Sequence, residues 1–432
     1  MQTKAQKLVR DLLHYDREEL VTLNLFWIGF VVYTVSWTIS KSTQVNYIIC
    51  QLLQLAGLFV FIPACIRLIK FRFNNEYQKI VFFLFLFWAI IIFLRGLEEI
   101  DTDLVKLIVF DAWFGGFLYF APIVMLFPLK LIYYKKIFDV LIILAVFYVI
   151  FDIMFIHNLM EPDVENVLSR DVVEYFSKTL SVPIAFILLT YVYHSKPKIF
   201  FAICILILTA FFGVVRARRG LLFMIAASFL LAYLIFWYNS KNRTLILIIS
   251  SFFLAVMGVV GLYLLHTGSI NLFENIEDRG MEDTRSGVEK YFKRDMEGID
   301  WIIGRGMMGE YYSPTGDQNL FRDSYRGTVE TDYLNMVLKG GYINLILLLM
   351  ILIPAMFLGI FKSKNTLSKA AGVWILFWLL NTYPSTVQVF TLNYLLVWVS
   401  AGICYSSKIR SLPEKFLIAY FRPNKILKPG SS

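Results

Sequence analysis

Charged side chains are scarce in this sequence. Asp, Glu, Lys and Arg make up 17% of the 432 residues, whereas 58% are hydrophobic. Ordinary soluble domains carry about 25% charged residues. This balance excludes a secreted or cytosolic enzyme, because so much apolar material needs a bilayer around it. Cysteine is also scarce: its four copies lie in apolar segments without a CxxC spacing. We therefore expect free thiols, with no disulfide framework and no structural zinc.

Long apolar windows fill most of the chain. A membrane-spanning helix needs roughly 20 mostly apolar residues, and twelve windows are candidates. They are residues 21–38, 45–68, 78–94, 104–128, 137–156, 179–193, 199–214, 220–238, 244–265, 341–361, 368–381 and 386–404. Residues 1–20 mix charges with a weak amphipathic pattern, which predicts an interfacial helix instead of a cleavable signal, so the first span would be a signal anchor. The sequence thus predicts an all-α polytopic membrane protein with about 12 transmembrane helices.

Lysine and arginine are concentrated in alternate connections between the predicted spans. The sequence has 41 Lys and Arg against 32 Asp and Glu, a net charge of +9. A basic balance can indicate nucleic-acid binding, but here the cations concentrate in every second connection between spans. Lysine and arginine collect on the cytoplasmic side of membrane proteins. We therefore expect cytoplasmic N- and C-termini and no nucleic-acid partner.

One long hydrophilic segment interrupts the spans. Residues 266–330 contain 8 Lys or Arg and 13 Asp or Glu, a net charge of −5. Long loops cross a membrane largely regardless of charge, and loops of this length are usually functional. We expect a cap over the outer membrane face. The predicted organisation is an interfacial helix (1–20), spans one to nine (21–265), the cap loop (266–330), a re-entry helix with spans ten to twelve (331–404) and a cytoplasmic tail (405–432).

Three arginines occupy an outer connection, where cations are disfavoured. They are Arg216, Arg218 and Arg219, followed by Gly220 at the start of a span. Guanidinium groups bind phosphate through a planar fork of donors, and a helix N-terminus also favours an anion. The alternative is that these side chains only anchor the helix by reaching lipid head groups. The sequence leaves both interpretations open.

The chain re-enters the membrane after Glu330. Helical spacing places Glu330, Tyr333 and Leu334 on one face. A carboxylate in the first turn of a helix can act simply as a cap, because it is favoured by the helix dipole. Asp332 lies in the same stretch. Asp111 and Asp152 are secondary candidates within or near span ends, although a position near the water interface explains them better.

Several motifs of this chain resemble the O-antigen ligase and polymerase superfamily, which are membrane glycosyltransferases of the GT-C type. The stretch from Tyr333 and Leu334 to Gly341 is similar to the family's Tyr-Leu segment, glycine turn and long span. Arg219-Gly220 resembles its Ser-Arg-Gly start of a span. Arg285, followed by a helix and the turn from Gly304 to Gly309, resembles its cap pattern. The motifs cover roughly the second half of the chain.

The resemblance implies an enzyme of the bacterial inner membrane with a periplasmic active site. The donor would be an undecaprenyl-pyrophosphate-linked glycan and the acceptor another lipid-linked repeat unit, with membrane lipids and a chain-length regulator as further partners. Glu330, Arg219 and Arg285 would be catalytic. Arg216, Arg218, Tyr333 and Asp332 would bind substrate. Ligases of the family carry histidine where this chain has Glu330, which favours a polysaccharide polymerase.

The implied enzyme is inverting and needs neither metal nor cofactor. No DxD-like pair in a plausible metal context occurs on the predicted outer face, which fits a lipid-linked donor better than a nucleotide sugar. Two other functions stay open. A ligase that joins finished O-antigen to the lipid A core would differ in its acceptor. A flippase or exporter of lipid-linked oligosaccharide would move substrate without forming a bond, but proline positions in the two halves form no repeat that supports a transporter.

Overall fold

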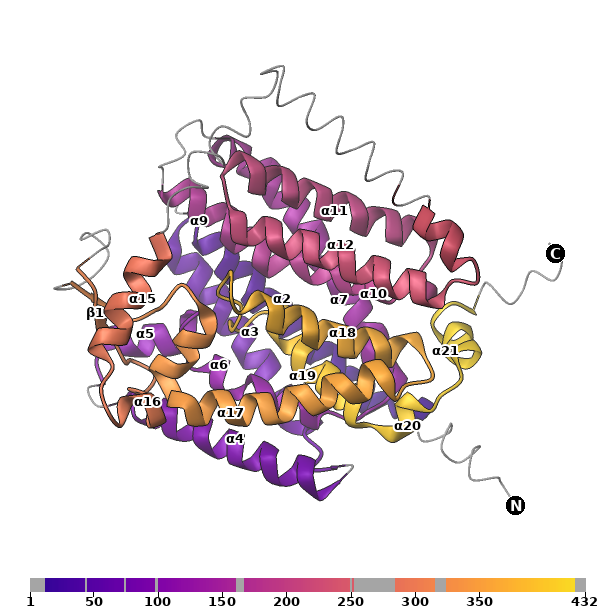
Figure 1. The fold of residues 1–432 in the computed structure, drawn as a ribbon, viewed down its shortest axis with the longest axis horizontal. Coiled ribbons are helices and arrows are strands. Elements are labelled where there is room, and N and C mark those ends of the chain that lie inside the picture. The colour runs from indigo at the N-terminus through magenta and orange to yellow at the C-terminus, as the bar shows by residue number, and fades with distance from the viewer. Residues whose placement is uncertain are drawn as a thin grey trace.

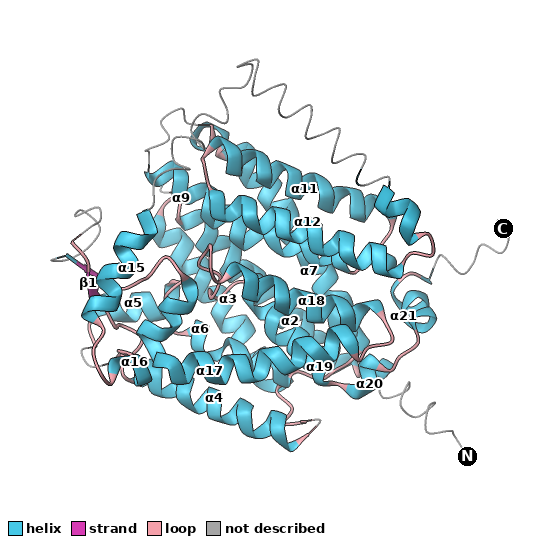
Figure 2. Cartoon of the chain, viewed as in Figure 1, coloured by secondary structure: helices cyan, strands magenta, loops and turns pink. Residues whose placement is uncertain are grey.

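A computed structural model of the chain is an α-helical bundle (Figures 1 and 2). It describes residues 12–42, 45–73, 75–97, 100–160, 167–248, 251, 284–314 and 324–423, with the backbone alone at 167–171 and 284–286. Eight helical segments among these residues are long and apolar enough to cross a membrane. They are α2 (Arg17–Ser40), α3 (Tyr47–Leu68), α4 (Glu76–Leu94), α7 (Leu131–Met154), the stretch Val172–Leu189, α11 (Lys196–Val215), α12 (Arg219–Asn239) and α17 (Asp332–Phe361).

The remaining elements are shorter. Val172–Leu189 runs from α9 (Val167–Phe176) through the π-helical η2 (Ser177–Ser181) and η3 (Val182–Ile184) to α10 (Ala185–Leu189). Helices α18 (Thr366–Asn381) and α19 (Leu392–Tyr405) are apolar but short. The others are α5 (Thr102–Phe110), α6 (Phe117–Phe120), η1 (Ala121–Leu126), α8 (Ile156–Leu159), η4 (Tyr191–Tyr193), α15 (Thr284–Asp295), α16 (Asp300–Ile303), α20 (Ser407–Arg410) and α21 (Glu414–Phe421), with an antiparallel pair of β1 (Tyr311–Tyr312) and β2 (Tyr325–Arg326).

The predicted count of about 12 spans is not confirmed, because eight of the described helical segments are long and apolar enough to cross a membrane. The windows 368–381 and 386–404 correspond to the shorter helices α18 and α19, and three further windows differ from the helices. The window 104–128 is not one helix, because α5 ends at Phe110 and the chain turns at Asp111 before α6 and η1. Asp111 Oδ1 accepts hydrogen bonds from the N–H groups of Trp113 and Phe114, which stabilises the turn. Most of window 244–265 lies outside the described residues. Helix α2 begins at Arg17, so the end of the predicted interfacial helix belongs to the first long helix.

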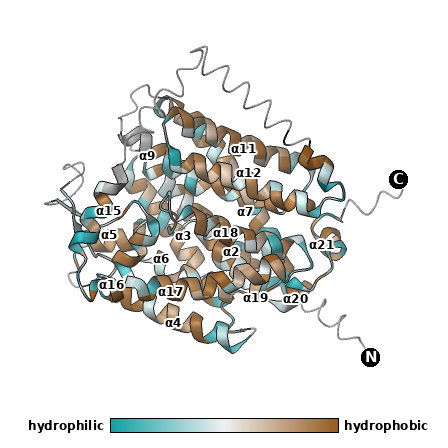
Figure 3. Ribbon diagram, in the orientation of Figure 1, coloured by the Kyte–Doolittle hydropathy of each residue, from teal (hydrophilic) through white to brown (hydrophobic). Residues whose placement is uncertain are grey.

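Apolar side chains cover the flanks of the bundle as well as its interior. Trp374, Trp378 and Trp398 are fully buried between helices. On the outside, Phe59 is 77% exposed and Phe200 67% exposed. Figure 3 shows hydrophobic residues along the helices and hydrophilic residues gathered mainly toward the two ends of the bundle. A soluble protein rarely exposes so much apolar surface, so this distribution fits a protein surrounded by lipid.

The helices of the bundle begin and end at two opposite ends. At one end Lys130 pairs with Glu19, Asn239 Nδ2 donates to Thr366 Oγ1 at 3.2 Å, and the N–H of Lys364 donates to Arg410 O at 2.9 Å. We call this the lysine end; it includes Lys130, Lys135, Lys136, Lys196, Lys198, Lys241, Lys362, Lys364, Lys369 and Lys408. Helix α11 has 20 residues, about 30 Å of helix, so Arg216 lies at the opposite end, which we call the arginine end.

Of the predicted cap (266–330), residues 266–283 and 315–323 lie outside the described residues, and we use the name cap for residues 284–314 and 324–330. The cap contacts the helices through closely packed glycines. Helix α17 is broken at Gly341, whose φ is +65°. A Cβ at Gly341 would lie 2.0 Å from Ile302 O, and one at Gly304 would lie 2.5 Å from Gly340 N. The N–H of Arg305 donates to Leu338 O at 2.7 Å. The glycine turn of the cap and the glycine break of α17 therefore pack backbone against backbone, with no room for side chains between them.

Two arginines hold this junction in place. The Arg95 guanidinium, at the end of α4, donates to Ile303 O and Gly304 O, each at 2.8 Å. Arg305 donates through Nε to Asp300 Oδ2 at 2.8 Å and through Nη1 to Asp295 Oδ2 at 2.5 Å. Burial acts to lower the pKa of Arg305, but the hydrogen bonds and charges of these two carboxylates raise it overall. The cap is thus fixed to α4 and α17 at the arginine end.

We predict that Gly341→Ala lowers the free energy of unfolding by roughly 2 to 5 kcal/mol, because the new Cβ combines a positive φ with a collision against backbone. Thermal unfolding in detergent measures this change. Gly287→Ala is the matched control, since a Cβ at Gly287 meets nothing within 4 Å. Equal melting temperatures for Gly341→Ala and the wild type would show that the junction tolerates a side chain.

Candidate functional site

The arginine end is built around a tight turn between α11 and α12. Ala217 has a φ of +49°, which is uncommon for a residue with a Cβ. The N–H of Ala217 donates to Val214 O, and that of Arg218 donates to Gly213 O at 2.8 Å. This turn sends neighbouring side chains in different directions. Arg216 is fully buried, Arg218 is partly buried and Arg219 is exposed at the first residue of α12.

One carboxylate serves two cations beside this turn. Arg218 Nη2 lies 2.8 Å from Glu174 Oε2, and Lys178 Nζ pairs with the other oxygen of the same carboxylate. The Lys178 side chain is 3% exposed. Its Nζ also donates to Thr386 O at 3.1 Å and lies 5.1 Å from the centroid of the Trp113 ring. A buried ammonium needs such partners, because its desolvation is expensive.

The loop between α18 and α19 completes this cluster. Asp332 is fully buried, and its Oδ2 accepts hydrogen bonds from the N–H groups of Val387 at 2.9 Å and Gln388 at 2.7 Å. The Asp332 N–H donates to Thr382 O at 2.9 Å. Gly220 lies against the same loop, since a Cβ there would come within 2.7 Å of Pro384 O. The first residues of α12 and α17 therefore meet on residues 382–388.

We call the residues Arg216, Arg218, Arg219, Glu174, Lys178 and Asp332, with loop 382–388, the arginine-end cluster. Among the residues that the structure describes, this cluster contains four cations and two carboxylates, and the carboxylates contact Arg218, Lys178 and backbone N–H groups. Arg219 also stands at the N-terminus of a 21-residue helix, where the helix dipole favours an anion. The cluster therefore suits a negatively charged ligand.

Glu330 lies outside α17, contrary to the expected helical face. Thr331 is the N-cap residue and α17 begins at Asp332. The Thr331 hydroxyl donates a hydrogen bond to Glu289 of α15, with 2.6 Å between Oγ1 and Oε1. Glu330 and Thr331 form a bend before the helix, and Thr331 has extended backbone angles (φ −84°, ψ 111°). Glu330 is exposed between the buried Val329 and Thr331, so its carboxylate stands on a fixed backbone and is open to solvent.

Residues of the cap pack against α17, close in sequence to Glu330. Val288 and Phe292 of α15 pack with Leu334 and Val337 of α17. Burial raises the pKa of Tyr311 to about 12; the charge of Arg326 acts in the opposite direction and that of Glu330 adds to the rise. The Tyr311 hydroxyl thus stays protonated at neutral pH and donates to Thr328 O at 3.2 Å.

Other predicted site residues have distinct surroundings. Tyr333 stacks on the exposed Tyr383, with 6.5 Å between ring centroids. Arg285 belongs to α15, but its side chain lies outside the described part of the structure. Asp111 pairs with Lys41 at 3.2 Å. Asp152 is buried in the last turn of α7 near Tyr148.

Sequence reasoning missed Glu174 and Lys178. Their spacing of four residues is an ion-pair signal on a helix, but an exposed surface pair has the same spacing. Lys178 sits in the π-helical η2, and π-helical turns are frequent at functional sites. Within the described residues no group of three His, Cys, Asp or Glu side chains is placed to hold a metal ion.

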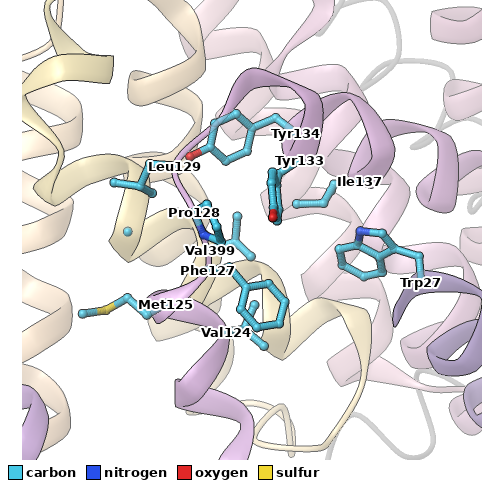
Figure 4. A pocket seen from close by; sticks show the side chains of 11 residues that line it. Trp27, Val124, Met125, Phe127, Pro128, Leu129, Tyr133, Tyr134, Ile137 and Val399 are labelled. Atoms are coloured by element: carbon cyan, nitrogen blue, oxygen red, sulfur yellow. The ribbon is translucent and has the colours of Figure 1, made fainter. Parts of the chain in front are cut away.

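One small enclosed space lies between η1 and α7. The pocket in Figure 4 is lined by Trp27, Met125, Tyr133 and other residues between η1 and α7, and its volume is about 20 Å³. A space of that size holds little more than one water molecule. It lies near Lys130, at the lysine end.

No known protein family, curated protein or solved structure matches this chain. The fold and composition define an all-α protein with several helices able to span a membrane.

We predict that Glu174→Gln lowers the free energy of unfolding by about 3 kcal/mol, because it leaves the buried Lys178 without its carboxylate. Lys178→Met in the same chain should recover part of this loss, so a double-mutant cycle would give a coupling of about 1 to 3 kcal/mol. The matched control is the exposed pair Lys106–Asp103. Its Lys106→Met and Asp103→Asn cycle should show less than about 1 kcal/mol. Additive effects at Glu174 and Lys178 would contradict the shared-carboxylate arrangement.

Proposed function

We propose that this protein is a polysaccharide polymerase of the O-antigen type, which transfers an undecaprenyl-pyrophosphate-linked glycan onto a lipid-linked repeat unit. The observation that supports the proposal most is the excess of cations at the arginine end, close to the ends of apolar helices. A pyrophosphate carried on a lipid would reach this position from the membrane. The motif resemblance described above adds the class of donor. Under this proposal the arginine end faces the periplasm and the lysine end faces the cytoplasm, in agreement with the positive-inside rule.

The proposed reaction needs charge stabilisation and orientation. The acceptor hydroxyl oxygen attacks the anomeric carbon of the donor, and the bond from that carbon to the pyrophosphate oxygen breaks. The leaving undecaprenyl pyrophosphate keeps the electron pair. Arg219 and Arg285, with Arg216 as a helper, would stabilise the negative charge that develops on it. The hydroxyl proton passes to Glu330 or to water. Inversion at the anomeric carbon follows from this single displacement.

Glu330 fits the role of a group that orients the acceptor. Its exposed carboxylate lies between two buried residues whose backbone is fixed by the cap and α17. A fixed backbone limits the positions of the carboxylate, and orientation of reactants is a large part of catalysis. Tyr333 follows Glu330 by three residues, and its ring stacks on that of Tyr383 from loop 382–388. The two rings would offer the acceptor an aromatic surface. The proposed acceptor site is therefore the rim between α17 and loop 382–388.

We predict that Arg219→Lys reduces polymer formation by at least about tenfold, because an ammonium cannot replace a bidentate guanidinium contact with phosphate. Polymer length is measured by gel electrophoresis after incubation of purified protein with lipid-linked repeat units. Arg243→Lys is the matched control, since Arg243 follows the opposite end of α12 and its Nη2 donates to Tyr238 O. If Arg219→Lys keeps full activity, Arg219 does not bind the pyrophosphate.

We predict that Glu330→Gln reduces polymer formation by roughly 10²- to 10⁴-fold if Glu330 accepts the proton, with an unchanged melting temperature. The control is Glu310→Gln, which removes an exposed carboxylate from the same cap. Normal turnover by Glu330→Gln would remove this residue from the mechanism.

In the wild-type assay, a single coupled product with lipid A core would indicate a ligase. Movement of the lipid-linked substrate across vesicles without bond formation would indicate a flippase.

A further inference from the structure

A second cationic site lies at the lysine end, away from the arginine-end cluster. A cavity of about 330 Å³ opens between the start of α7, the η4–α11 junction and the end of α21. Its lining residues are Lys135, Phe138, Asp139, Tyr193, His194, Ser195, Lys198, Phe421, Arg422 and Pro423. Ligand pockets usually have volumes of about 300 to 1,000 Å³. Figure 1 shows α21 at the same end of the bundle as α20.

Three cations line this cavity against one carboxylate. Lys198 Nζ lies 3.9 Å from Asp139 Oδ1, with both side chains 46% exposed. Lys135 and Arg422 form no ion pair with any residue that the structure describes. The cavity also adjoins the N-terminus of the 20-residue α11, where Ser195 is the N-cap and its side chain makes no capping hydrogen bond. The first-turn N–H groups of a helix lack partners within the helix and attract anions.

The remaining wall is aromatic. The Phe421 ring packs against Phe138 and Tyr193, with centroids 5.4 and 5.2 Å apart, and Phe138 contacts the edge of the His194 ring at 4.6 Å. Burial and the charges of Lys198 and Arg422 lower the pKa of His194 to about 3. His194 is therefore neutral at physiological pH, and Lys135, Lys198 and Arg422 supply the positive charge.

The hydrogen bonds of His194 explain its position. Thr190 Oγ1 donates to Phe186 O at 2.6 Å and lies 2.9 Å from His194 Nε2. Because the hydroxyl hydrogen is already committed, Nε2 carries the imidazole proton and donates to Thr190. The ring is thereby fixed as part of the cavity wall. The site combines a rigid apolar wall with a cationic rim at the boundary of the apolar bundle.

We propose that this cavity binds a phosphate group. Anionic phospholipids and small soluble phosphates share this chemistry, and basic pockets between membrane helices commonly hold lipid phosphates. The cations would contact the phosphate oxygens, with Arg422 able to offer two donors at once. The aromatic wall would contact the apolar part of an ester. A bound phosphate would join α7, α11 and α21, which come from three distant parts of the chain.

Binding can be measured on the purified full chain in detergent by native mass spectrometry. The lipid arm compares phosphatidylglycerol with phosphatidylcholine of the same acyl chains. We expect preferential retention of phosphatidylglycerol. In the variant Lys135→Gln/Lys198→Gln/Arg422→Gln its affinity should fall by at least about tenfold. The matched control, Lys241→Gln/Lys364→Gln/Lys408→Gln, removes three exposed lysines from the same end. Its affinity should stay close to that of the wild type.

A second arm distinguishes the source of the phosphate. Inorganic phosphate and pyrophosphate are titrated while thermal unfolding is followed. Stabilisation by these ions, lost in the cavity variant, together with no lipid preference, would assign the site to a soluble phosphate. Asp139→Asn keeps the experiment decisive if the triple variant folds poorly, because removal of the carboxylate should strengthen binding severalfold. Equal retention of both lipids with no effect of phosphate, or an equal loss in the lysine control, would overturn the proposal.

Discussion

The sharing of Glu174 between Arg218 and Lys178 is the constraint on which the arginine end depends. Lys178 is buried beside Trp113 and reaches Thr386 O, so its charge is compatible with an apolar bundle only while these partners are present. The same contacts bring together α9, α12 and loop 382–388. Asp332 continues the chain of contacts to α17 through two backbone N–H groups. The contacts of Glu174, Lys178 and Asp332 thus connect four segments that are distant in sequence.

The cap is positioned by a different kind of contact. Gly304 and Gly341 allow the cap turn and α17 to pack without intervening side chains, and Arg95 closes the junction from α4. Next to Glu330, the hydrogen bond between Thr331 and Glu289 joins the start of α17 to α15. The glycine motif that resembles a glycosyltransferase signature therefore has a structural reason of its own, independent of any ligand. The cations proposed to bind the ligand and the glycines that position the cap therefore belong to separate motifs.

Apolar windows were enough to predict the long helices, because a stretch of about twenty apolar residues is typical of a membrane-spanning helix. They could not predict the break at Asp111, which depends on two side-chain hydrogen bonds. Helical spacing also placed Glu330 inside a helix, because periodicity does not contain the contact between Thr331 and Glu289. The three arginines were visible from the charge pattern. Glu174 and Lys178 were not, since only the packed structure distinguishes a buried pair from a surface pair.

The proposed function requires that a lipid-linked pyrophosphate binds at the arginine end. The most direct measurement is an electron cryomicroscopy map of the full chain with a non-reactive undecaprenyl-pyrophosphate analogue. We predict two phosphate densities in contact with Arg219 and beside loop 382–388, with the density of the lipid chain running between apolar helices. Pyrophosphate density found only in the cavity at the lysine end, with the arginine-end cluster empty, would contradict the proposal.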